Sequence, residues 1–114
     1  MTTVFAQSMN VRVSPRKLRL VADAVKKLSV TSALEKLPFL AKSGAEPVLK
    51  TLKSAIANAT HNLKLKTEDL KIQNILVDEG TKMKRRDTSH GARFGGGVIT
   101  KRTAHIKVIL EGTK

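Results

Sequence analysis

The sequence lacks cysteine, tryptophan and tyrosine altogether, and phenylalanine occurs only three times. Without cysteine, disulfide frameworks, thiolate metal sites and cysteine nucleophiles are excluded. The shortage of aromatic rings argues against a platform on which the bases of a single strand stack. Long apolar runs are missing too, since no window approaches 18 apolar residues and the N-terminus has no basic region followed by an apolar stretch. We therefore expect neither a membrane span nor a secretory signal.

Acidic residues are also scarce, which leaves a large positive charge. The 114 residues hold 22 Lys and Arg against nine Asp and Glu, a formal net charge of +13. Such a surface repels itself and destabilises the compact state unless an anionic partner neutralises it. A hydrophobic fraction of 40% still allows a small core, and the length suits one domain, residues 1–114. The composition predicts an intracellular, one-domain protein that binds a polyanion.

The positive charge is concentrated at the two flanks of the chain. Residues 1–30 hold six basic side chains and one acidic one, and residues 81–107 hold eight basic side chains and one acidic one. Between them, residues 31–80 are nearly balanced, with seven basic and six acidic side chains. A single basic run is usually a solvated face. Two separated blocks in so basic a chain instead favour a surface that faces nucleic acid.

The first elements are a strand and a helix. Residues 4–13 are rich in apolar and β-branched side chains and predict a strand that stops at Ser14. Ser14 is a preferred N-cap, and Pro15 fits the first helical position, so a helix should begin there. Its apolar stripe recurs at helical spacing and consists of Leu18, Val21, Ala22, Val25 and Leu28.

Two capping-box patterns predict two further helices. Ser32 with Glu35 marks the start of a short helix that Pro38 ends or bends. Ser43 with Glu46 marks the start of a third helix of about four turns, which has the strongest periodicity in the chain. Its apolar positions are Ala45, Val48, Leu49, Leu52, Ala55, Ile56 and Ala59.

The period changes to that of strands in the last third of the chain. Leu70 and Ile72 alternate with polar residues, and Ile75 and Val77 alternate in the opposite phase, which predicts a bulge near Gln73-Asn74. Residues 105–110 predict a closing strand with alternate apolar positions. Three strands and three helices predict an α+β fold, in which the helices pack on one face of a three-stranded antiparallel sheet.

Between these last two strands lies a long basic segment with glycines near its middle. Strand-like residues enter and leave it, and Gly91 and Gly95-Gly96-Gly97 supply a turn, which predicts a protruding β-hairpin arm over residues 80–104. If each side has about ten residues, the arm projects on the order of 30 Å. It lacks an apolar face, and an isolated two-stranded ribbon is marginal in water. The alternative is a disordered basic loop, and either form would be stabilised by an anionic partner such as a folded nucleic acid.

The start of the first helix makes a similar case. Arg16, Lys17 and Arg19 lie beside the positive end of the helix dipole, which is unfavourable by about 0.3–1 kcal/mol per exposed charge. A phosphate bound at the helix N-terminus would turn this cost into a binding site. The alternative is simple tolerance of exposed surface charge.

Catalytic and metal-binding patterns are not found. His61, His90 and His105 are the only candidates for an imidazole base or ligand, and no two have the spacing of a metal site. Neither a Gly-x-Ser-x-Gly elbow nor a phosphate loop is present. We expect no enzyme, no cofactor, no metal and no small-molecule substrate.

Four motifs resemble those of one protein family, both in their residues and in their order along the chain. They are residues 14–23 (SPRKLRLVAD), 52–59 (LKSAIANA) followed by His61-Asn62, 77–80 (VDEG) and 101–106 (KRTAHI). Together they resemble the bacterial L-twenty-two family of large-subunit ribosomal proteins over nearly the whole chain. The resemblance implies a cytoplasmic, structural component of the large ribosomal subunit that binds the large ribosomal RNA, supports subunit assembly and contacts neighbouring large-subunit proteins. It also implies that the hairpin lines the exit tunnel and meets the nascent polypeptide.

The resemblance assigns residues as well. It implies RNA contacts at the first helix, along the third helix and along the arm, by Arg12, Ser14, Arg16, Lys17, Arg19, Lys53, Asn58, His61, Asn62, Lys82, Lys84, Arg85, Arg86, Arg93, Lys101, Arg102, Thr103 and His105. It implies that the tunnel-lining tip consists of Arg86, Asp87, Thr88, Ser89, His90, Gly91, Ala92 and Arg93. The tip departs from the family, which usually carries an Arg-Gly-Arg-Ala stretch where this chain has residues 93–99 (RFGGGVI).

Two other classes of protein stay open on the residues themselves. One is a free-standing nucleic-acid binder, such as a nucleoid or RNA-chaperone protein, although no apolar dimer seam is visible. The other is a binder of anionic membranes, which would require an amphipathic helix with large apolar residues opposite Lys and Arg. The first helix has part of that character, but the basic arm has no role in such a protein.

Overall fold

A three-stranded antiparallel sheet forms one layer of the molecule, and the computed structural model describes residues 2–88 and 96–112 of the chain. The strands are β1 (Thr2–Val11), β2 (Leu70–Glu79) and β5 (Ala104–Gly112), in the order β1-β5-β2. The last strand in sequence is therefore the central one, and it pairs with both others. Every second residue of β5, from Ala104 to Gly112, is buried, because successive side chains point to opposite faces of a sheet.

Both outer strands are irregular. The bulge expected near Gln73-Asn74 is confirmed, since the pairing of β2 with β5 shifts between Ile72 and Asn74. Strand β1 begins and ends two residues earlier than expected. Asn10 adopts a left-handed φ of 54°, and the β1–β5 register slips beyond Ser8, so regular pairing cannot run on to residue 13.

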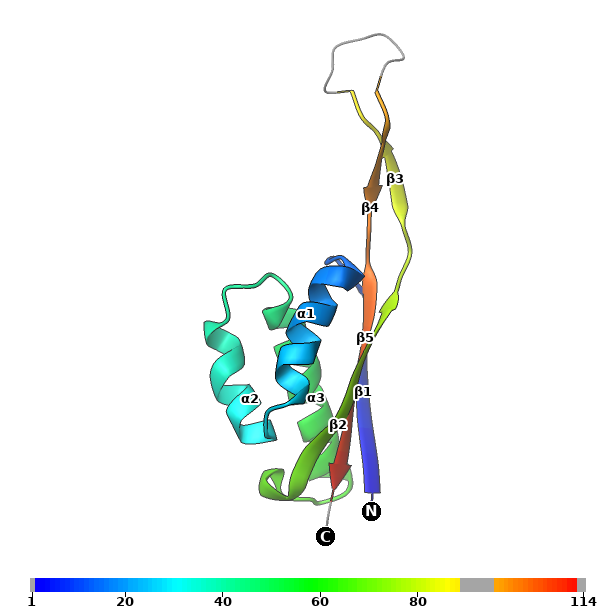
Figure 1. Ribbon diagram of the computed structural model, residues 1–114. Helices are drawn as coiled ribbons and strands as arrows, with labels where there is room; N and C mark the ends of the chain where they lie inside the picture. Colours follow the sequence, from blue (N-terminus) through cyan, green and yellow to red (C-terminus); the bar gives the residue numbers. More distant parts are fainter. Residues whose placement is uncertain (1, 89–95, 113–114) are drawn as a thin grey trace.

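Three helices cover one face of the sheet (Figure 1), as the sequence predicts. Helix α1 (Pro15–Lys26) packs on β2, and α3 (Ala45–Asn62) packs on β1 and β5. The start of α1 is confirmed: Ser14 is extended, and its hydroxyl accepts a hydrogen bond from the backbone N–H of Lys17 at 3.4 Å. The core between the two layers is formed by apolar residues of α1, α2, α3 and the three strands.

The expected start of the second helix is wrong. Helix α2 (Val30–Lys36) is capped by Ser29, whose Oγ accepts from the Ser32 N–H at 3.2 Å. Ser32 therefore lies inside the helix rather than at its cap. The earlier start has a packing reason, because it places Val30 in the core. Pro38 ends the helix as expected, within the 3-10 turn η1 (Leu37–Phe39).

The expected cap of the third helix is also wrong. Gly44 is the N-cap of α3 and makes no side-chain capping bond, while Ser43 belongs to the preceding turn. Glu46 does not complete a capping box but pairs with Lys50 at 3.2 Å on the exposed surface. Close packing fixes this start, because a Cβ on Gly44 would lie 3.0 Å from Leu18 Cδ2.

The arm continues directly from the sheet. A second 3-10 turn, η2 (Thr67–Asp69), leads into β2, and beyond β2 the strands β3 (Met83–Arg86) and β4 (Val98–Lys101) pair with each other antiparallel. The expected hairpin is confirmed in the described residues and gives the chain extents of 64 × 24 × 18 Å. Residues 89–95, which include Gly91, Gly95 and most of the expected tip, lie outside the described part of the chain.

Candidate nucleic-acid interface

The N-terminal turn of α1 faces the base of the arm across a hollow of about 530 Å³. Its lining combines both basic flanks of the sequence and consists of Ser14, Pro15, Arg16, Arg19, Glu79, Lys82 and Arg102. The first turn of α1 holds no acidic residue. Four cations and one carboxylate therefore surround the positive end of a helix dipole, an arrangement that attracts an anion.

Two of the arginines near this hollow are anchored by backbone carbonyls. Arg12 donates to the carbonyl of Arg102, and the Arg19 guanidinium donates to the carbonyl of Val77 at 3.2 Å. These bonds join the start of α1 to β2 and to the base of the arm. Arginine has five N–H donors, so each side chain keeps donors for a ligand while its position is restrained.

The remaining cations of the hollow are less constrained. Lys82 lies 3.7 Å from Glu79, but both side chains are exposed, and such a pair contributes little to stability. Within the described residues, Arg16 and Lys17 are exposed and form no ion pair. Their charge is available to an external anion.

The base of the arm is packed tightly. The Gly80 N–H donates to the Thr103 carbonyl at 2.9 Å, and the buried Thr103 hydroxyl donates to the Thr81 carbonyl at 2.7 Å. A Cβ on Gly80 would collide with Thr103 Oγ1 and approach His105. His105 is half-buried, and its Nδ1 accepts from the Asn10 N–H at 3.0 Å. Thr103 and His105, both expected to contact RNA, thus also hold the domain and the arm together.

Along the arm, the expected RNA-contacting side chains are mostly exposed. Lys84, Arg85, Arg86 and Lys101 lie on β3 and β4, and all are exposed. The Arg85 guanidinium donates to the carbonyl of Lys84 at 2.9 Å. The apolar residues of β4 are exposed too, so the described arm has no core of its own. Arg93 lies outside the described residues.

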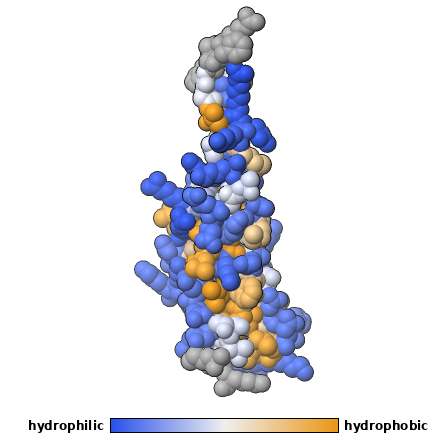
Figure 2. Space-filling model, turned by 90° about the vertical axis from the view of Figure 1, so that its right-hand side faces the viewer, coloured by the Kyte–Doolittle hydropathy of each residue, from blue (hydrophilic) through white to orange (hydrophobic). Residues whose placement is uncertain are grey.

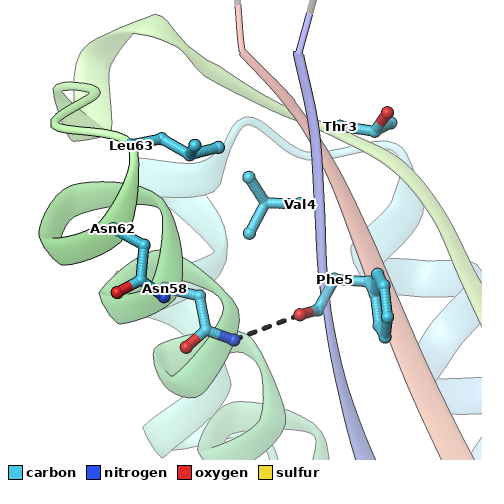
Figure 3. A pocket seen from close by; sticks show the side chains of 6 residues that line it. All are labelled: Thr3, Val4, Phe5, Asn58, Asn62 and Leu63. Carbon is cyan, nitrogen blue, oxygen red and sulfur yellow. Dashed lines mark hydrogen bonds between the residues drawn. The ribbon is translucent and has the colours of Figure 1, made fainter.

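The residues expected from the third helix form a separate group. Lys53, His61 and Asn62 are exposed on α3, which ends at the opposite end of the domain from the arm (Figure 1). Asn58 is half-buried, and its Nδ2 donates to the Phe5 carbonyl at 3.1 Å (Figure 3). With Asn62 and Leu63 it lines a hollow of about 320 Å³, which lies beside the start of β1. The α1–arm hollow and the end of α3 are therefore two surfaces, not one.

Sequence reasoning missed one cation. Lys107 lies on β5 with its ammonium 4.5 Å from the centroid of the Phe5 ring, a cation–π contact. Its place between the buried Ile106 and Val108 could have revealed it, because strand alternation sends it to the outer face of the sheet.

Neither a metal site nor a membrane-spanning helix is found in the described residues. No group of three or more His, Asp or Glu side chains there could hold a metal ion. Over residues 2–88 and 96–112, no helix combines the length and apolar character needed to cross a membrane.

The fold and the charge distribution together define a class: a small α+β domain whose cations gather at one helix terminus and along a two-stranded arm. Comparison with known families is consistent with this. Residues 6–111 match the family described as ribosomal protein L22p/L17e. The chain belongs to this family of ribosomal proteins.

Individual relatives agree over almost the whole chain. The chain is 41% identical over 105 residues to the large ribosomal subunit protein uL22 of Mycoplasma capricolum, with 91% of this chain and 92% of the relative covered. It is 45% identical over 102 residues to the protein of that name from Mesoplasma florum, covering 89% and 88%. The corresponding protein of Desulfitobacterium hafniense is 44% identical over 104 residues, covering 91% and 90%.

Proposed function

We propose that this chain is a structural component of the large ribosomal subunit and that it binds the large ribosomal RNA. The relatives, which it matches over about nine-tenths of its length, are named as large ribosomal subunit proteins. The observation that carries RNA binding is the hollow between α1 and the arm. There, cations from residues far apart in sequence meet at a helix N-terminus.

The RNA-binding surface extends from this hollow along the arm. Phosphates contact Arg16, Lys17 and Arg19 at α1 and follow the cations of the arm outward. Lys53 in the middle of α3, and His61 and Asn62 at its end far from the arm, bind a second segment of RNA. The separation of the two surfaces on an elongated molecule suits a protein that joins RNA segments during assembly of the subunit.

The arm has a further role in this proposal. A ribbon without a core of its own needs surroundings that stabilise it, and folded RNA with many phosphates provides them. The whole chain acts as one domain with residues 80–104 as its arm. We propose that the arm lines the nascent-polypeptide exit tunnel and that residues 86–93 approach the nascent chain.

Sedimentation tests the proposal directly. The tagged full-length chain is expressed, and its position in a gradient of cell lysate is measured at low and then at high salt. We expect it to migrate with large subunits under both conditions, because an arm inserted into RNA is held by geometry as well as by salt-sensitive charge contacts. A slow peak, or removal from the subunits at modest salt, would instead indicate a free-standing nucleic-acid binder.

A further inference from the structure

One face of the sheet is left without a covering layer. The helices lie on one side, and the outward residues of the three strands form the other side, which Figure 2 views directly. Phe5 on β1 pairs across strands with Ile109 on β5, and Leu76 lies on β2 next to Lys107. Phe5 is 54% exposed, Leu76 is 39% exposed and Ile109 is half-buried. These three residues form an apolar centre. We use the name outer sheet face for this centre together with the polar residues around it.

The polar neighbours of this centre are balanced in charge. They comprise Thr3, Gln7, Lys71, Asn74, Asp78, His105, Lys107 and Glu111. Lys71 and Glu111 are direct cross-strand partners, and Asp78 faces His105. The face thus carries two cations and two carboxylates, whereas the chain as a whole carries +13.

This balance distinguishes the outer sheet face from the RNA-binding surfaces. A polyanion gains from an excess of cations, and here each carboxylate offsets one of the two lysines. One of these, Lys107, already lies against the Phe5 ring. An apolar centre surrounded by polar groups of both signs is instead the usual composition of a protein–protein interface.

We propose that the outer sheet face binds another protein, which places an apolar side chain against Phe5, Leu76 and Ile109 and charged groups of both signs against the surrounding residues. A second copy of this chain is a poor candidate, because two molecules of charge +13 repel each other. The partner is therefore a different polypeptide. Since the chain is placed in the large subunit by the proposed function, the partner is a protein beside it there.

A site-specific photo-cross-linker distinguishes protein from RNA at this face. In one variant of the full-length chain, benzoylphenylalanine replaces Leu76, which is exposed and outside the core. In a second variant of the same chain, it replaces Lys84 on the arm. Large subunits that contain either protein are irradiated, and the adducts are treated with ribonuclease or with protease. We expect the Leu76 adduct to resist ribonuclease and to contain a peptide of a second protein, and the Lys84 adduct to contain RNA.

A variant tests whether this adduct depends on the apolar centre. Phe5→Asp should lower the yield of the Leu76 adduct by roughly tenfold or more, as for loss of a central interface residue. Ser43→Asp, which adds the same charge in an exposed turn, should leave the yield unchanged. If Phe5→Asp impairs folding, as judged by its unfolding transition, Phe5→Ser provides the same comparison with a neutral side chain.

The two proposals fail in different ways. An RNA adduct at Leu76, no adduct there, or a yield that is insensitive to both Phe5 variants would overturn the protein interface. Absence of the chain from large subunits, or of RNA at the Lys84 probe, would overturn the proposed function. In a chain found outside the subunits, a Leu76 adduct could not come from a neighbouring subunit protein, so the interface as proposed would be overturned too.

Discussion

Gly80 shows how a single hydrogen atom can determine where the arm leaves the domain. Its backbone bonds to Thr103, and any Cβ at this position would overlap the buried Thr103 hydroxyl. We predict that Gly80→Ala lowers the free energy of unfolding by about 1–3 kcal/mol, the usual cost of overpacking. Urea denaturation followed by circular dichroism measures it.

Gly97 is the matched control for this substitution. A Cβ there would meet nothing within 4 Å, so Gly97→Ala should change the free energy of unfolding by less than about 0.5 kcal/mol. In addition, Thr103→Ala removes the hydroxyl that the new methyl group meets, so Gly80→Ala should cost less in that background. Equal costs in the two backgrounds would mean that the contact with Thr103 is not the cause.

The contacts at this scale were beyond sequence reasoning. The family resemblance implies that Arg12, Asn58 and His105 contact RNA, but in the structure each also bonds to a distant backbone group. Asn58 bonds to Phe5, 53 positions away, and Arg12 to Arg102, 90 positions away. Periodicity reports only near neighbours, so a pairing that the tertiary fold creates leaves no local pattern.

At the scale of elements, the cap of α2 is the clearest case of competing local signals. Ser29 and Ser32 both precede apolar residues, and Ser32 has the Glu at the third position that Ser29 lacks. Burial of Val30 decides in favour of Ser29. The start of α1 was predictable because the Ser14 cap and Pro15 agree with the spacing of the buried apolar residues that follow. The bulge in β2 was predictable because the apolar residues on each side of it alternate for long enough to reveal the change of phase.

The corrected cap can be tested by alanine substitution. Ser29→Ala should reduce the free energy of unfolding by about 0.5–2 kcal/mol, because it leaves an N–H of the first turn without its acceptor. Ser32→Ala, at the serine that the sequence pattern wrongly favours as the cap of this helix, should have an effect below about 0.5 kcal/mol. The assignment would be reversed if thermal or urea unfolding showed Ser32→Ala to be the more costly of the two.

Substitutions at the two ends of α1 can distinguish a local RNA-binding site from a general effect of positive charge. Arg16→Ala combined with Arg19→Ala should weaken binding to ribosomal RNA and reduce the slope of log affinity against log salt by about one to two units. Filter binding or fluorescence anisotropy over a salt series measures this slope. Lys26→Ala with Lys27→Ala removes the same charge from the other end of α1, away from the hollow, and should reduce the slope less. Equal effects of the two pairs would contradict a local site.

On the scale of the whole molecule, the domain and the arm divide the work of stability and binding. Strands β3 and β4 contribute no residue to the hydrophobic core in the described part of the chain. We predict that replacing residues 85–101 by a short glycine–serine turn keeps cooperative unfolding and shifts the free energy of unfolding by less than about 1 kcal/mol. Association with large subunits should fall, as measured by sedimentation.

A loss of cooperative unfolding in the shortened chain would show that the arm supports the domain.

The class of fold and the arm could be predicted from the sequence because their signals extend over many residues. These signals are the change of hydrophobic period after the third helix and a basic stretch without an apolar face. The charge balance of the outer sheet face did not follow, since it depends on which residues of three strands become neighbours.

The central position of β5 has a consequence for the order in which the chain matures. Strands β1 and β2 pair only with β5 in the described sheet, and β5 is synthesised after both of them. While translation proceeds, helices can form and the first hundred residues can collapse, but no two strands of the sheet can be joined. Sheet formation and closure of the core therefore wait for residues 104–112, and pairing across about a hundred residues makes that last step slow relative to local folding. Until then the newly made chain exposes apolar strands together with its dense positive charge, and early capture by RNA would neutralise that charge.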